Sequence, residues 1–276
     1  MIHNCLVLTG LLSLNILLAL PEDDPHVSGV KFVGNSSIKT KHLEHIINIQ
    51  NKTFFADQSF DRRVLKLDAI SIKNYYLSNG YLDVAVIDSF TINNEGADIF
   101  FRIQEGKQYF LQSINLTGNG KLTDRQIISI FKLKENKPFN PVAIQVNHNF
   151  LDEAYHEKGK LFLETKISQV VTDSVIVNID IQEGPDVHIN KIYVEGLGEG
   201  LDSNIVFREL QFQNGNKYIK SSIDASQRRL MEIGIFSMAA IMPVKNTTND
   251  TTVNILIQLR DLDQREILSS GGYYPV

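Results

Sequence analysis

Ile114-Asn115-Leu116-Thr117-Gly118-Asn119 alternates apolar and polar residues and then reaches a Gly-Asn pair. Such an alternation is typical of a half-buried strand, and Gly-Asn is typical of a turn that needs positive φ. Similar runs occur once before and once after this stretch: Val30-Lys31-Phe32-Val33-Gly34-Asn35 and Ile192-Tyr193-Val194-Glu195-Gly196. Because Gly34, Gly118 and Gly196 lie 84 and 78 residues apart, the pattern indicates an internal repeat.

Two further patterns recur in the same order along the chain. One is a helix end at a glycine: Tyr76-Leu77-Ser78-Asn79-Gly80-Tyr81-Leu82, Tyr155-His156-Glu157-Lys158-Gly159-Lys160-Leu161 and Leu230-Met231-Glu232-Ile233-Gly234-Ile235-Phe236. The other closes each unit: Ile103-Gln104-Glu105-Gly106, Ile181-Gln182-Glu183-Gly184 and Ile257-Gln258-Leu259-Arg260. We expect Gly80, Gly159 and Gly234 to take the left-handed position that ends a helix. Three units are therefore predicted, over about 27–109, 110–187 and 188–264.

Each unit is predicted to fold as strand, helix, helix, strand, strand. In the second unit, Thr123 precedes the apolar run of a short helix and can cap its free N–H groups. The longer second helix shows an apolar face at helical spacing in the first unit: Leu65, Ala69, Ile72 and Tyr76. Counting back from the glycines gives the corresponding slots in the other two units: Ile144, His148, Leu151 and Tyr155, then Ile219, Ile223, Ser226 and Leu230. A hairpin such as 161–170 with 174–183 completes the unit.

The composition excludes several classes of protein. The chain has 43% hydrophobic and 21% charged residues, as folded domains do, which excludes wholesale disorder. The net charge of -5 gives no basis for nucleic-acid binding. A single cysteine, Cys5, excludes an internal disulfide framework and a thiolate metal cage. Residues 1–20 are largely apolar and precede a polar break, which predicts an export signal.

The combination of patterns resembles a known family. The β-α-α-β-β order, the Val-x-Gly-Asn opening, the Tyr-x-x-x-Gly-Tyr-Leu helix end and the closing Gln-Glu-Gly are similar to polypeptide-transport-associated (POTRA) repeats. These repeats belong to the outer-membrane surface antigen superfamily, which includes assembly and translocation proteins of the BamA and TamA kind. The resemblance covers about residues 27–264 and implies an α+β fold, a tandem of three POTRA-like domains, each a three-stranded sheet covered by two helices. The third unit departs from the pattern, because Gln258-Leu259-Arg260 lacks Glu-Gly.

The chain's last residues resemble the start of a membrane segment. In this superfamily a β-barrel follows the last repeat, and residues 265–276 are similar to the entry into its first strand. Twelve residues cannot form a barrel of at least eight strands. We therefore expect either the periplasmic part of a longer protein or a truncated tail.

No set of residues in the sequence predicts a catalytic, cofactor or metal site. His148, Asp152 and His156 are spaced so that one helix could present all three as ligands, but their slots fit a packed or solvated helix better. The loop 196–200 is glycine-rich after a strand, as a dinucleotide-binding loop would be, but the spacing of its glycines favours a simple turn. We expect no enzymatic activity and no cofactor.

The resemblance implies a docking and relay module on the periplasmic side of the outer membrane of a Gram-negative envelope. Such a module would bind unfolded outer-membrane client polypeptides by β-augmentation, that is, by adding a client strand to a free sheet edge. The edge strands implied are 82–93, 161–170 and 236–244. The implied partners are these clients, other subunits of an assembly machinery, and the membrane through a C-terminal barrel. Two alternatives remain open: a soluble envelope scaffold of such repeats without a barrel, and the accessory region of a larger surface hydrolase.

Overall fold

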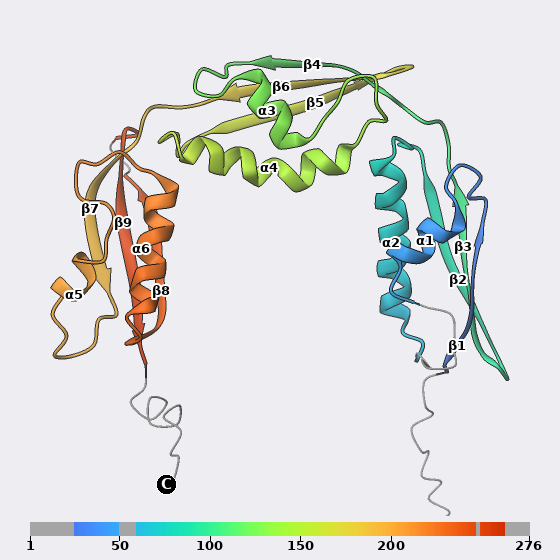
Figure 1. Cartoon of the computed structure of the whole chain (residues 1–276), viewed down its shortest axis with the longest axis horizontal. Helices are drawn as coiled ribbons and strands as arrows, with labels where there is room; N and C mark the ends of the chain where they lie inside the picture. The colour runs from blue at the N-terminus through green and yellow to red at the C-terminus, as the bar shows by residue number, and fades with distance from the viewer. Residues whose placement is uncertain (1–24, 50–58, 247–248, 263–276) are drawn as a thin grey trace, which may run out of the picture. The chain divides into compact units, whose positions relative to one another are not determined.

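The structure is a computed structural model that describes residues 25–49, 59–246 and 249–262. The predicted export segment 1–20 and the tail 265–276 lie outside the described residues. Within the described part the chain forms nine strands and six helices in three successive repeats (Figure 1). No helix among these residues is both long enough and apolar enough to cross a membrane.

The three repeats have the same order of elements. The first contains β1 (Val27–Val33), α1 (Thr40–Ile46), α2 (Arg62–Ser78), β2 (Ala85–Asn93) and β3 (Gly96–Gln104). The second contains β4 (Leu111–Thr117), α3 (Asp124–Phe131), α4 (Pro141–His156), β5 (Glu164–Val171) and β6 (Val175–Gln182). The third contains β7 (His188–Glu195), α5 (Asn204–Phe207), α6 (Lys220–Glu232), β8 (Phe236–Lys245) and β9 (Thr252–Asp261). The predicted α+β fold of three β-α-α-β-β domains is confirmed.

Each repeat has its own three-stranded sheet with the last strand in the centre. The strand orders are β1-β3-β2, β4-β6-β5 and β7-β9-β8. The central strand pairs parallel with the opening strand, since two helices carry the chain across between them. It pairs antiparallel with the hairpin strand that precedes it. The opening strand and the hairpin strand are therefore both edges of the sheet.

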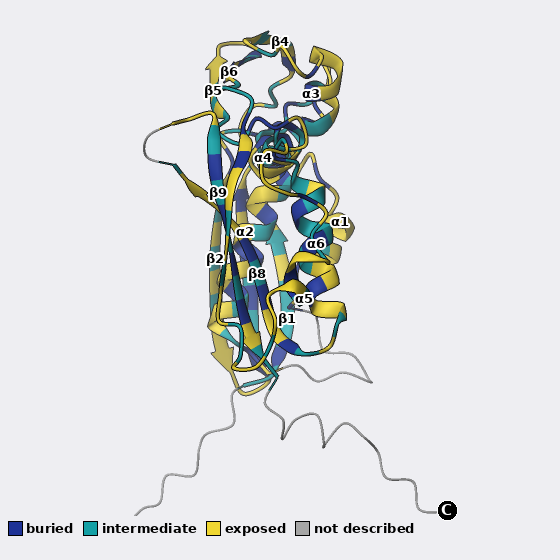
Figure 2. Ribbon diagram, turned by 90° about the vertical axis from the view of Figure 1, so that its left-hand side faces the viewer, coloured by how far each residue is buried: buried dark blue, intermediate teal, exposed yellow. Residues whose placement is uncertain are grey.

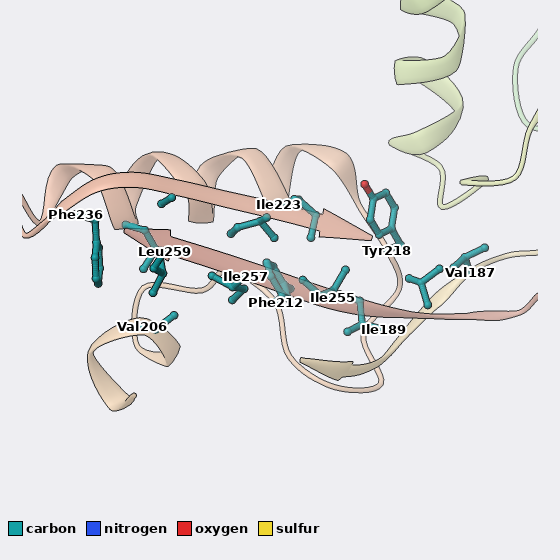
Figure 3. Close-up of a cluster of buried hydrophobic side chains, with 14 residues drawn as sticks. Val187, Ile189, Val206, Phe212, Tyr218, Ile223, Phe236, Ile255, Ile257 and Leu259 are labelled. Carbon is teal, nitrogen blue, oxygen red and sulfur yellow. The ribbon is translucent and has the colours of Figure 1, made fainter. Parts of the chain in front are cut away.

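The cores lie between the sheets and the long second helices. Burial alternates along the central strands, and the alternating colours of β9 can be followed in Figure 2. The apolar face predicted for the second helices is buried at most slots: Leu65, Ala69, Ile72, Tyr76, Ile144, Leu151, Tyr155, Ile223, Ser226 and Leu230. In the third repeat, Ile223 of α6 gathers with Phe236 and with Ile257 of β9 in one apolar cluster (Figure 3).

The second helices end at Ser78, His156 and Glu232, so Gly80 and Gly234 follow the cap residue with positive φ as expected, and Gly159 lies one residue further on. The structure corrects two other details of the helix prediction. His148 is not in the core, since its side chain is 38% exposed, and the neighbouring Asn147 is buried instead. Ile219 is the N-cap of α6 rather than a residue of its helical face.

The marker glycines stand at the ends of strands and helices. Gly34, Gly118 and Gly196 follow the opening strands with φ between 79° and 92°. A Cβ at these three positions would lie 2.0 to 2.1 Å from a carbonyl oxygen of the central strand. Gly80, Gly159 and Gly234 follow the second helices with φ between 76° and 87°.

The third closing pattern was aligned wrongly by two residues. The glycine after the opening strand faces the carbonyl of Ile103 in the first repeat, Ile181 in the second and Leu259 in the third. Leu259 therefore corresponds to the isoleucine of Ile-Gln-Glu-Gly, and Asp261 corresponds to the glutamate. The sequence alone favours the wrong alignment, because Ile257-Gln258 has the same two residues as the start of Ile-Gln-Glu-Gly and lies two residues before the true match.

The closing carboxylate holds the loop that follows the opening strand. Glu105 accepts hydrogen bonds from the backbone N–H and the hydroxyl of Ser37, the latter at 2.7 Å. Glu183 accepts from the N–H of Lys121 at 2.6 Å. In the third repeat the Asp261 carboxylate lies beside Gly198 in the equivalent loop. The Gln-Glu pattern is thus a long-range contact that fixes a turn to the end of the central strand.

Candidate strand-binding edges

Each sheet exposes two edge strands, and an edge strand carries backbone N–H and C=O groups that the ladder does not use. These groups recur in all three repeats, and they could bind a partner with little demand on sequence. Which edges are open depends on what else the fold places beside them.

The edges of the opening strands are partly covered by their own repeats. In β4, the N–H of Leu111 donates to the carbonyl of Lys137, and Glu135 accepts from the N–H of Ile114. In β7, the N–H of Ile189 donates to the carbonyl of Asn216. In the first repeat a bridge joins residues 26 and 59 next to β1. The segment before each second helix therefore occupies the start of this edge.

The hairpin strands β2 and β5 have open edges. Among the described residues, no backbone group of β2 or β5 bonds to anything outside its own hairpin ladder. β5 pairs continuously with β6 from Glu164 to Val171, and β2 pairs continuously with β3 from Ala85 to Asn93. The residues that precede these strands in the expected ranges, 82–84 and 161–163, lie in turns. Each of these strands is therefore regular over eight or nine residues, with one side paired in the sheet and the other side open.

The third hairpin strand, β8, is different. Its pairing with β9 shifts register between Phe236 and Met238. Helix α6 lies closely against β8, whereas α2 and α4 make far fewer contacts with β2 and β5. The N–H of Ile241 donates to the side-chain oxygen of Gln227 on α6 at 3.2 Å. One group of this edge is therefore already occupied.

The sheet face beside β5 is polar. On the side away from the helices, Asn115 donates to the side chain of Asn178, and Thr117 donates to Asp180. These residues line a shallow groove with Lys166 and Ser168 of β5. A strand added at this edge would extend the sheet, so its side chains would continue the polar face on the side away from the helices and the apolar face on the side of the core. Such an environment fits a strand whose residues alternate between apolar and polar.

The second and third repeats are linked by charged groups. The Lys160 side chain lies 3.1 Å from Asp186, forming an ion pair, and also donates to the carbonyl of Gly184. Lys217 approaches the same carboxylate at 3.4 Å. Lys160, and then Lys217, hold the pKa of Asp186 below its usual range by stabilising the charged form.

A carboxylate from the second repeat also caps a helix of the third. Glu157, just past the end of α4, accepts from the backbone N–H of Ser221 and from its hydroxyl, the latter at 2.8 Å. Ile219, the N-cap of α6, has no capping side chain of its own. Nearby, burial lowers the pKa of His156 and raises the pKa of Tyr218 to about 12. The junction is thus a packed and hydrogen-bonded contact.

The three residues considered for metal binding do not form a ligand set. The His148 and Asp152 side chains lie 3.5 Å apart on the surface of α4. No group of three or more ligand side chains that could hold a metal occurs in the described part of the chain. The glycine-rich stretch 196–200 is an irregular turn that precedes the short helix α5. The sequence missed Gln227 and Glu157 as interaction partners, because nothing in the local pattern marks a contact across repeats or onto a strand edge.

Comparison with known proteins gives a consistent result. The family model described as "POTRA: Surface antigen variable number repeat" matches residues 25–106 and 109–184, together more than half of the chain. A curated protein named "Outer membrane protein assembly factor BamA" from Nitratidesulfovibrio vulgaris is 24% identical over 96% of this chain. A protein of the same name from Neorickettsia risticii is 22% identical over 90% of it. The chain spans 34–35% of the length of these two relatives.

A solved structure shares the fold. The crystal structure of POTRA domains 3–5 of Haemophilus influenzae BamA aligns with a TM-score of 0.62 at 18% identity. The alignment covers 86% of this chain and 96% of the other. At this identity the likeness concerns the fold, and it extends over all three repeats.

Proposed function

The chain belongs to the POTRA family of surface antigen repeats, and on this premise we propose that it docks unfolded outer-membrane client polypeptides at the open edges of β2 and β5. The family is non-enzymatic, and its members named above are outer-membrane assembly factors. The proposed place of action is the periplasmic side of the outer membrane. The clients bind by β-augmentation and pass along the repeats toward the site of insertion.

The observation that carries this proposal is the difference between the edges of the opening strands and the edges of β2 and β5. The backbone of β4 and β7 is engaged by the segment before the second helix. The backbone of β2 and β5 is engaged only by its own hairpin partner within the described residues. An extended chain can pair with these free groups whatever its side chains are, which suits a receptor for many clients.

The energetics favour weak and reversible capture. Each net backbone hydrogen bond contributes about 0.5–1.5 kcal/mol, and an eight-residue edge such as β5 uses only alternate residues outward. A single edge therefore holds a client at a dissociation constant on the order of 0.1–1 mM. Two tethered edges bind one client more tightly when it spans both. Weak individual contacts allow the client to be released again.

The test is amide hydrogen exchange on the full chain with a ten-residue peptide of alternating apolar and polar residues. We expect slower exchange at alternate N–H groups of β2 and β5. A peptide of the same composition without alternation is the control. Single proline substitutions at Lys166, Ile167, Ser168 and Gln169 identify which N–H groups of β5 face the open edge. Two alternate positions should tolerate proline, because their N–H groups point outward, whereas proline at the other two removes an N–H that pairs with β6. The two tolerated variants should lose binding of the peptide at this edge. Protection confined to the helices, or no protection at millimolar peptide, contradicts strand addition.

A further inference from the structure

The direction of the backbone groups in β8 follows from one side-chain contact. Ile241 donates its N–H to Gln227 on α6, so this N–H is not part of the ladder between β8 and β9. In an antiparallel pair, the N–H and C=O of one residue point to the same side, and successive residues alternate. Ile241 therefore points its backbone groups to the open edge, and so do Ala239 and Pro243.

Pro243 removes a second donor from the same edge. Proline has no backbone N–H, and it is tolerated in a sheet where the missing group would face outward. Pro243 pairs opposite Ile255 without interrupting the β8–β9 register, as that placement requires. The two central donors of the β8 edge, at residues 241 and 243, are thus unavailable to an incoming strand.

Other features of β8 act in the same sense. The register shift between Phe236 and Met238 forms a bulge, where the Ser237 hydroxyl donates to the carbonyl of Arg260 at 3.2 Å. Bulges, prolines and lysines are devices by which edge strands avoid unwanted pairing. Lys245 ends the strand and is exposed.

The hairpin strands of the first two repeats lack the proline, the register shift and the glutamine acceptor, although β5 contains Lys166. Seven residues before the marker glycine, where the third repeat has Gln227, the second has Asp152 and the first has Lys73. Asp152 approaches His148 on its own helix, and Lys73 is exposed. Neither β2 nor β5 contains a proline. The closure is therefore specific to the third repeat.

We propose that the β8 edge is closed to incoming strands, with Gln227 as the positioning residue that closes it and Pro243 as a fixed block. The inference rests on the proposed function, because it assigns client capture to β2 and β5 and excludes β8. The third repeat then passes a client on without holding it by backbone pairing. An open edge in this repeat would also pair with the same edge of a second copy.

The experiment compares the full chain with three variants by amide exchange and sedimentation. Gln227→Ala removes the acceptor, and Gln227→Glu keeps an acceptor at the same place. Gln227→Ala combined with Pro243→Thr restores two outward donors. Gln145→Ala, an exposed glutamine on α4, is the matched control. Circular dichroism and exchange of the β9 amides verify that each variant keeps its fold.

Two of the measurements, the exchange rate of the Ile241 amide and self-association, need no client. The Ile241 amide should exchange at least about tenfold faster in Gln227→Ala, as expected for the loss of one hydrogen bond of about 1.4 kcal/mol, but not in Gln227→Glu or Gln145→Ala. The double variant should self-associate more strongly than the wild type. Equal Ile241 exchange in Gln227→Ala and the wild type overturns the role of Gln227.

The third reading uses the alternating peptide. In the wild type we expect protection at β2 and β5 and none at β8, whereas the double variant gains protection at alternate residues from Ala239 to Lys245. Protection of β8 in the wild type overturns the closure while leaving strand addition intact. Protection of β5 but not of β8 in a folded double variant also overturns it. Absence of protection at β2 and β5 refutes the proposed function instead, and the closure is then decided by the two readings without client.

Discussion

Two glycines of the third repeat provide a matched pair for measuring what a close backbone approach costs. Gly196 and Gly234 have φ of 79° and 78°, so alanine at either site meets the same backbone strain. A Cβ at Gly234 would have no atom within 4 Å, whereas a Cβ at Gly196 would lie 2.1 Å from the carbonyl oxygen of Leu259. The two substitutions therefore differ in one physical respect.

The expected magnitudes follow from this geometry. The left-handed conformation costs an alanine about 1–2 kcal/mol, partly offset by about 0.4–1 kcal/mol because alanine restricts the unfolded chain. Gly234→Ala should therefore lower the free energy of unfolding by about 1 kcal/mol. Gly196→Ala must in addition move the end of β7 away from β9, since real Cβ atoms essentially never approach within 3.0 Å. Overpacking of this kind adds about 1–3 kcal/mol.

The assay is native-state amide exchange on the full chain, read at the buried central strand β9. Because each repeat has its own core, exchange at β9 reports the third repeat, while β3 and β6 serve as internal references that should not change. A difference of 1.4 kcal/mol corresponds to a tenfold change in exchange rate. If the two variants accelerate exchange at β9 equally, the close approach of Gly196 to Leu259 has no energetic weight and the reasoning is refuted.

Two further predictions concern the junction between the second and third repeats. Glu157→Ala should weaken the first turn of α6 by about 1 kcal/mol, because the Ser221 N–H loses its cap. Amide exchange in the first turn of α6 measures this loss, and Glu153→Ala, at an exposed residue, is the control. Equal exchange in the Glu157→Ala and Glu153→Ala variants would contradict the capping role. Acidification should weaken the junction: Asp186 has a lowered pKa beside Lys160, so its contribution is complete above the ordinary aspartate value of about 3.9 and is lost as the pH falls through the lowered value. Asp186→Asn should abolish this part of the acid sensitivity in a pH titration of unfolding, and an unchanged acid profile would count against it.

The local structure of each repeat could be predicted from the sequence because it follows from local patterns. Alternation marked β1, β4 and β7, the Thr123 signal marked the start of α3, and helical spacing marked the buried tyrosines Tyr76 and Tyr155. Thr123 indeed forms a capping box with Gln126. These features depend on residues a few positions apart, so each is visible in a short window of sequence. Repetition of the windows then gave the domain number and the family resemblance.

The sequence was weaker where two patterns looked alike. The pattern Ile257-Gln258-Leu259 places Leu259 where the other repeats have glutamate, whereas Asp261 occupies that place beside Gly198. His148 was placed in a core slot, although Asn147 is the buried residue. In both cases the residue pattern is compatible with two alignments, shifted by two residues in the strand and by one in the helix. Only packing against the neighbouring elements distinguishes the two alignments.

Which strand edges are open was decided by the tertiary structure alone. A strand edge is open or closed according to which distant group lies beside it, and no period in the sequence encodes that. Gln227 is 14 residues from Ile241, and Glu157 is 64 residues from Ser221. From the sequence, the three hairpin strands are equivalent, and only the fold distinguishes them, because a backbone N–H is free only where packing brings no acceptor to it.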